Sequence, residues 1–139
     1  MNGILLDTHA FIWAVDNQLY RFSANSQAQL NTALQQQQLY LSAISLWEVA
    51  MLVAKNRIQL KMSAQEWLHQ AISRSGIIIV PIDIPIATLS STLALHGDPA
   101  DRLIVASAIC QKQRLCTQDS KILDFAAQPH SALSVLALA

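Results

Sequence analysis

The stretch from residue 98 to residue 119, DPADRLIVASAICQKQRLCTQD, decides the fold class of this chain. Its opening Asp-Pro pair is typical of a helix start, because aspartate caps free N–H groups and proline fits the first helical position. Apolar and small residues follow, so the pattern predicts a helix over 99–113. The apolar residues 115–117 then predict a buried strand, and Asp119 comes directly after that strand.

The same alternation of strand and helix extends along the rest of the chain. Short apolar runs predict strands over 3–6, 39–41, 77–80, 115–117 and 133–136. Capping residues and apolar spacing predict helices over 8–17, 23–34, 42–54, 63–73, 85–95, 99–113 and 120–125. Because no hairpin signal interrupts this order, we expect an α/β fold with a parallel sheet of four to five strands and helices on both faces. The β-branched run 77–80 predicts a strand that is buried on both faces.

Composition bounds the classes of protein that the chain can belong to. Its 139 residues fit one domain, which we expect to span residues 1–139. Only 13% of the residues are charged, about half the usual share, so we expect part of the surface to be covered by a protein partner. A formal net charge of zero argues against binding nucleic acid through overall charge and leaves a local basic groove open.

The cysteines and the termini point to a reducing compartment. Cys110 and Cys116 form no CxxC pair, so neither a zinc site nor a disulfide framework is expected. The N-terminus lacks the basic start of a signal peptide, and no apolar run of about 18 residues is long enough to span a membrane. We therefore expect a cytoplasmic protein that has no membrane association.

Five of the nine acidic residues lie in otherwise apolar stretches, namely Asp7, Glu48, Asp98, Asp101 and Asp119. A carboxylate in apolar surroundings is costly unless a positive partner meets it. The predicted fold places these acids near the carboxyl ends of its strands, where ligands bind in open α/β sheets. Two carboxylates at 4 Å repel by about 4 kcal/mol, so a shared pocket favours a divalent cation. Oxygen ligands favour Mg²⁺ or Mn²⁺ over zinc.

A structural role is the alternative for each aspartate. Asp7, Asp98 and Asp119 each precede a predicted helix and fit simple N-caps, and a carboxylate at Asp101 is favoured by the helix dipole. Glu48 differs, because it lies inside a helix among apolar neighbours and has no capping role.

Four segments resemble the motifs of PIN-domain ribonucleases, most closely those of the VapC-type toxins of bacterial type II toxin–antitoxin pairs. These segments are LLDTHAFIW (5–13), SAISLWEVAM (42–51), GDPADRLIVASA (97–108) and LCTQDSKIL (115–123). The resemblance implies that the carboxylates of four residues hold one or two Mg²⁺ or Mn²⁺ ions: Asp7, Glu48, Asp101 and Asp119. It implies an auxiliary role for Asp98, as a cap or a ligand of metal-bound water. Thr8 and Thr117 are expected to orient the ligands.

The resemblance also implies an activity and partners. The activity is metal-dependent endonucleolytic cleavage of RNA that leaves a 5′-phosphate. The implied partners are an RNA substrate, a cognate antitoxin protein and a second copy of the chain in a homodimer. The apolar side chains that could supply part of the surface that receives the antitoxin are Phe11, Trp13, Trp47 and Leu52. The alternative is that they are ordinary core residues, which we expect for at least half of them. Basic residues that either track phosphate or lie on solvated helix surfaces are Lys55, Arg57, Lys61 and Arg102.

One residue departs from the family's pattern, and two alternative functions stay open. Ala100 stands where close relatives usually carry a bulky aromatic residue, which should loosen local packing. An aspartyl-nucleophile phosphatase also places an aspartate after its first strand, but it usually needs a second one where this chain has His9. We expect His9 to have a surface or packing role. A non-catalytic binding module of the same fold is the other alternative, and it predicts no metal dependence.

Overall fold

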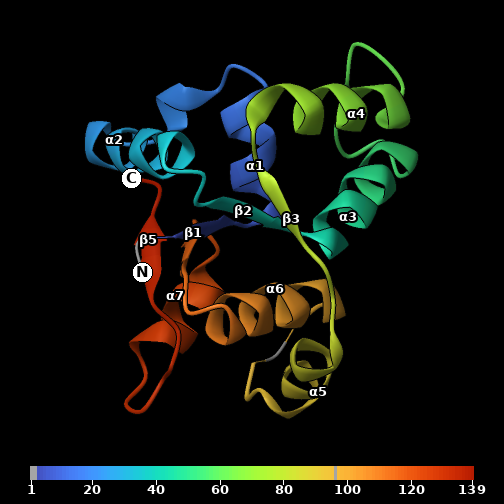
Figure 1. The fold of residues 1–139 in the computed structure, drawn as a ribbon. Coiled ribbons are helices and arrows are strands. Elements are labelled where there is room, and N and C mark those ends of the chain that lie inside the picture. The colour runs from blue at the N-terminus through green and yellow to red at the C-terminus, as the bar shows by residue number, and fades with distance from the viewer. Residues whose placement is uncertain (1–2, 96) are drawn as a thin grey trace.

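The computed structural model describes residues 3–95 and 97–139. These residues form a three-layer α/β/α domain around a parallel sheet of five strands in the order β3-β2-β1-β4-β5 (Figure 1). The strands are β1 (Ile4–Leu6), β2 (Leu39–Ser42), β3 (Ile78–Val80), β4 (Arg114–Thr117) and β5 (Val135–Ala137). The α/β fold predicted from the sequence is therefore confirmed.

Helices cover both faces of this sheet (Figure 1). They are α1 (Thr8–Val15), the short 3-10 helix η1 (Leu19–Arg21), α2 (Ala24–Gln35), α3 (Ala43–Ala54), α4 (Ala64–Ser75), α5 (Ile84–Thr92), α6 (Pro99–Cys110) and α7 (Ser120–Ala127). Helices α1, α2 and α4 lie on one side, and α5, α6 and α7 lie on the other. All the predicted helices are present, with ends that differ from the predicted ones by a few residues.

Side-chain caps explain where the α-helices begin. Each begins after an aspartate or serine whose side chain accepts a hydrogen bond from a backbone N–H of the first turn, the caps being Asp7, Ser23, Ser42, Ser63, Asp83, Asp98 and Asp119. At the start of α4, the Ser63 hydroxyl accepts from the N–H of Glu66 at 3.2 Å and donates to the Glu66 carboxylate at 3.1 Å.

The strand order fixes where a ligand site can form. From β1 the chain moves outward through β2 to β3, then crosses back to place β4 on the other side of β1. The strand order thus reverses between β1 and β4, and ligands bind at the carboxyl ends of strands at such a switch point. Asp7 and Asp119 lie just beyond these two ends.

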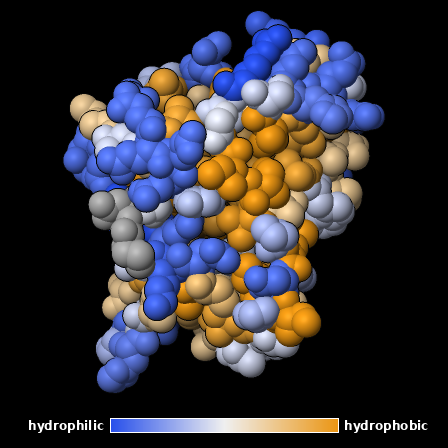
Figure 2. Space-filling model, viewed as in Figure 1, coloured by the Kyte–Doolittle hydropathy of each residue, from blue (hydrophilic) through white to orange (hydrophobic). Residues whose placement is uncertain are grey.

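Phe11 follows the core alternative, since it is fully buried and its ring packs edge-on against Trp67 with centroids 5.5 Å apart. The burial predicted for residues 77–80 is wrong. The run at 77–80, expected to be buried on both faces, forms the edge strand β3, and Ile78 is 41% exposed. Figure 2 shows hydrophobic side chains over β3 and the segment that leads to α5, where Ile82 and Ile84 are also exposed. Within the described residues, no helix is long and apolar enough to cross a membrane.

Candidate active site

Asp7 and Thr117 join the ends of the two central strands. One carboxylate oxygen of Asp7, Oδ1, accepts a hydrogen bond from the N–H of Ala10 at 2.8 Å and so caps α1. The other oxygen, Oδ2, accepts a hydrogen bond from the hydroxyl of Thr117 across the β1–β4 junction. The same hydroxyl accepts from the N–H of Asp119 at 3.0 Å. Thr117 therefore fixes the positions of Asp7 and Asp119 relative to one another.

Glu48 reaches the same region from α3. Its carboxylate accepts a hydrogen bond from the hydroxyl of Thr8, the residue after Asp7. The Thr8 hydroxyl also lies 2.9 Å from the hydroxyl of Ser45. Thr8 has a single proton, so Ser45 is the donor in the second contact. Ser45 was not among the site residues predicted from the sequence. It lies three residues before Glu48, on the same face of an apolar helix, and this spacing could have indicated the hydrogen bonds.

The start of α6 supplies the remaining two acids. Asp98 is exposed, and its carboxylate caps the helix by accepting from the N–H of Ala100 at 2.8 Å. Asp101 lies one turn further on and is partly buried. Arg102, considered as a phosphate contact, instead donates to the backbone carbonyl of Leu95 and so ties α6 to the preceding loop.

The pKa values of these carboxylates reflect their burial and the negative charge of their neighbours. Burial raises the pKa of Asp101 to about 7, and the negative charges of four other acids add to this shift, namely Glu48, Asp119, Asp98 and Asp7. Burial also raises the pKa of Asp7, against the opposing effect of its hydrogen bonds from Thr117 and Ala10. The pKa of Glu48 is raised by burial as well, although the hydrogen bond from Thr8 opposes the shift. The structure thus brings the five predicted acids together at one end of the sheet.

The donor chemistry of this pocket fits a hard divalent cation. All five groups are carboxylates that repel one another, and a bound positive ion would reduce this repulsion. Within residues 3–95 and 97–139, however, no three acidic, histidine or cysteine side chains are spaced to bind one ion directly in this conformation. Because Mg²⁺ keeps several water ligands and binds proteins through one or two carboxylates, the residues still fit such an ion.

The capping role and the pocket are compatible in this structure. Asp7, Asp98 and Asp119 all cap helices, as the structural alternative predicted. For Asp7 the cap uses only one carboxylate oxygen, and the other lies at the switch point with Thr117. His9 is exposed and its ring lies beside that of Trp13, with centroids 5.6 Å apart, as expected for a surface role.

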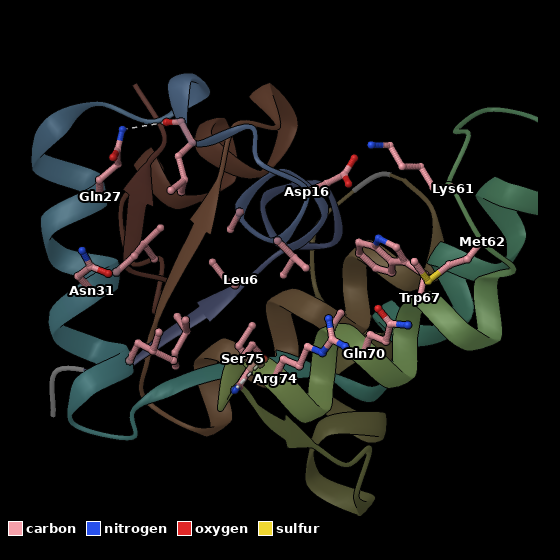
Figure 3. Close-up of a pocket in the computed structure, with 18 residues that line it drawn as sticks. Leu6, Asp16, Gln27, Asn31, Lys61, Met62, Trp67, Gln70, Arg74 and Ser75 are labelled. Carbon is pink, nitrogen blue, oxygen red and sulfur yellow. Dashed lines mark hydrogen bonds between the residues drawn. The ribbon is translucent and has the colours of Figure 1, made fainter.

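A separate groove lies between α2 and α4, beside the C-terminal end of α1 (Figure 3). It has a volume of about 510 Å³ and includes none of the five acids. Apolar side chains form much of its lining, among them Leu30, Leu34, Trp67, Ala71 and Ile77. Charged side chains stand at its margins: Asp16, Lys61 and Arg74.

Comparisons with known proteins agree on one family. A family model described as the PIN domain matches residues 4–128. Ribonuclease VapC22 of Mycobacterium tuberculosis is 31% identical over 123 residues, which cover 88% of this chain and 91% of that protein. A DNA-bound VapBC structure from Salmonella typhimurium has a TM-score of 0.71 at 14% identity and covers all of both chains. The FitAcB structure from Neisseria gonorrhoeae has a TM-score of 0.59 at 25% identity over 95% of each chain.

Proposed function

The chain belongs to the PIN-domain family, and we propose that it is a metal-dependent endoribonuclease that serves as the toxin of a type II toxin–antitoxin pair. The observation that carries this proposal is the position of Asp7, Asp119 and Glu48, which hydrogen bonds through Thr117 and Thr8 hold at one end of the sheet. The negative charges of these acids and of Asp98 act on Asp101. Their repulsion destabilises the fold, and a cation that binds a phosphate there would offset it.

We propose that four residues hold the cation, which is Mg²⁺ or Mn²⁺, either directly or through its water ligands: Asp7, Glu48, Asp101 and Asp119. The ion's chemistry is to lower the pKa of a water molecule and to offset negative charge on the phosphate. Asp98, exposed at the rim, would act through water as an auxiliary group. Thr8 and Thr117 hold the carboxylates of Glu48 and Asp7 in fixed directions, which limits the rearrangement needed when a cation binds.

The direct test is RNA cleavage by purified protein and its Asp7→Asn variant. The substitution keeps the side chain's shape, and the asparagine oxygen can still cap α1 through the N–H of Ala10. We expect cleavage with Mg²⁺ or Mn²⁺, no cleavage with EDTA, and no cleavage by the variant, which should melt as a folded protein. Cleavage by the variant at the unaltered rate would remove the proposed role of Asp7.

We further propose that the groove between α2 and α4 receives an apolar segment of the antitoxin. Solved structures that resemble this chain include VapBC from Salmonella typhimurium and a toxin–antitoxin complex from Klebsiella pneumoniae, at 14% and 22% identity. The apolar lining suits one face of a helix, and Lys61 and Arg74 suit acidic residues beside it. Asn31→Trp, at an exposed position of the lining, would fill the groove. It should abolish co-purification with the product of the neighbouring antitoxin gene and leave RNA cleavage intact.

The homodimer stays a prediction. Light scattering on the purified chain at several concentrations would measure its mass directly. A monomer at every concentration would remove the second copy from the proposed assembly.

A further inference from the structure

A group of aromatic and basic side chains runs along α1 and η1 from the acidic pocket. The guanidinium carbon of Arg21 lies 4.6 Å from the ring centroid of Trp13 and 5.6 Å from that of Tyr20. The rings of His9 and Trp13 are 5.6 Å apart. Tyr20 is 76% exposed, and His9 and Arg21 are exposed as well. We call these four residues the stacking patch.

We propose that the stacking patch binds unpaired bases of single-stranded RNA beside the cleavage site. This inference rests on the proposed ribonuclease function and assigns the binding of bases to particular residues. Unpaired bases are recognised by stacking on aromatic rings and on arginine planes, and this patch presents both kinds of surface together. In a duplex the bases are already stacked on one another, so they could not stack on the patch.

The patch is held in position by the surrounding fold. Asn17 takes a left-handed conformation with φ of 59° where α1 ends, which lets the chain turn back into η1. The carboxamide oxygen of Gln18 accepts a hydrogen bond from Nε of Arg21 at 2.8 Å. The carboxamide of Gln27 on α2 donates to the carbonyls of Leu19 and Phe22, at 2.8 and 3.1 Å. A platform fixed in this way loses little conformational freedom when a base stacks on it.

The terminal nitrogens of Arg21 complete the case for a nucleic acid ligand. The hydrogen bond to Gln18 uses Nε of the guanidinium, and Arg21 is exposed. A guanidinium oriented by an aromatic ring on one face and a hydrogen bond at Nε can bind a phosphate in bidentate fashion. The patch therefore provides one group for the backbone and several for the bases.

The position of the patch relative to the carboxylates is set by α1. Asp7 caps this helix, and His9 and Trp13 are four residues apart, so they lie on the same face. A rise of 1.5 Å per residue places Trp13 about 9 Å along the helix axis from Asp7. His9 lies in the first turn of this helix, two residues beyond Asp7. An RNA strand with a phosphate at the carboxylates would thus pass the patch within one or two nucleotides.

The test measures binding of a short labelled RNA of mixed sequence by fluorescence anisotropy. The RNA is used as a single strand, as a duplex with its complement, and as an abasic strand that keeps the phosphates. We expect Tyr20→Ala and Arg21→Ala each to weaken single-strand binding by about fivefold or more, since loss of one stacking contact has at least this effect. Tyr20→Ala should leave binding of the abasic strand unchanged, because only a base can stack on the ring.

Lys112→Asn is the matched control for loss of one positive charge. Lys112 is exposed before β4, at the end of the sheet opposite to the carboxylates, and its φ of 54° is one that asparagine tolerates. This variant should bind all three probes like the unaltered protein. Equal loss of binding in Lys112→Asn and Arg21→Ala would mean that overall charge attracts RNA, and it would overturn the proposal.

Cleavage separates this proposal from the function on which it rests. Tyr20→Ala should raise KM for single-stranded RNA and leave kcat within about twofold, because the ring is remote from the reacting phosphate. If both patch variants bind and cleave RNA normally and Asp7→Asn abolishes cleavage, the stacking patch is refuted and the nuclease stands. If the unaltered protein cleaves no RNA with Mg²⁺ or Mn²⁺, the nuclease itself is refuted.

Discussion

Replacing Asp101 with asparagine should stabilise the fold when no divalent cation is present. In the folded protein, burial and four neighbouring carboxylates raise the pKa of Asp101 to about 7. In the unfolded chain the same group titrates near 3.9. The folded state therefore binds the proton of Asp101 more tightly than the unfolded chain does. The contribution of Asp101 to the free energy of unfolding falls as the pH rises from about 4 to about 7, and it is constant above that. Asp101→Asn removes this loss.

The size of the effect follows from the two pKa values. A pKa of about 7 in place of 3.8 corresponds to about 4 kcal/mol if the whole difference acts on stability. Asp101 is only partly buried, so water screens the repulsion, and about 2 kcal/mol is the expected gain. For a chain of 139 residues, this gain corresponds to a rise of about 7 °C in Tm.

Thermal unfolding followed by circular dichroism measures this difference. The unaltered protein and Asp101→Asn are compared in EDTA at pH 4 and pH 8, with the expectation of a small difference at pH 4 and the full gain at pH 8. Asp124→Asn is the matched control, since Asp124 is exposed on α7 and is not among the acids that act on Asp101. It should leave Tm nearly unchanged at both pH values.

Adding Mg²⁺ should reverse the order of the two proteins. A ligand at a hundredfold excess over its Kd stabilises the native state by about 2.7 kcal/mol, which exceeds the expected gain from the substitution. The unaltered protein should gain this stability, and Asp101→Asn should gain less. Equal Tm values for the two proteins in EDTA at pH 8 would refute the crowding of charge at Asp101. A Tm that does not change when Mg²⁺ is added would refute the cation site.

Three further substitutions test other parts of the structure. Thr117→Val removes the hydroxyl that bonds Asp7 and Asp119, and RNA cleavage, measured on a labelled oligonucleotide, should fall by about 10- to 100-fold. Gly76→Ala should lower the free energy of unfolding in urea by about 1–2 kcal/mol, because φ is +77° and the added methyl would meet only ordinary contacts. Phe11→Ala should lower it by about 3–5 kcal/mol, since the ring is fully buried, and a smaller loss would mean that the ring is not in the core.

Most of the fold could be predicted from the sequence because local signals agree with the final structure. Aspartates and serines precede the helices, and in each case the side chain forms the expected cap, as at Ser63 and Asp98. The acids of the site were predicted for a related reason. A carboxylate in an apolar run is conspicuous, and the order of strands brings such residues together beyond β1 and β4.

The properties that the sequence could not decide depend on partners distant along the chain. The run of residues 77–80 is apolar whether its strand is central or at an edge, and only the sheet order places it at the edge. Phe11 is apolar on a helix whose other side carries Trp13, and local spacing does not say which side meets the core. Ser45 is an ordinary helical serine until Thr8 is brought against it, from 37 residues away in the sequence.

The helix caps also explain how the fold tolerates its acidic pocket. Asp7, Asp98 and Asp119 lie at the N-termini of α1, α6 and α7, and Asp101 lies in the first turn of α6. Each helix N-terminus carries a partial positive charge and free N–H donors, which stabilise nearby carboxylates. These helix ends oppose part of the mutual repulsion before any cation binds. One carboxylate can thus both cap a helix and bind a cation, because the hydrogen bond that its first oxygen accepts from the helix also fixes the direction of its second oxygen.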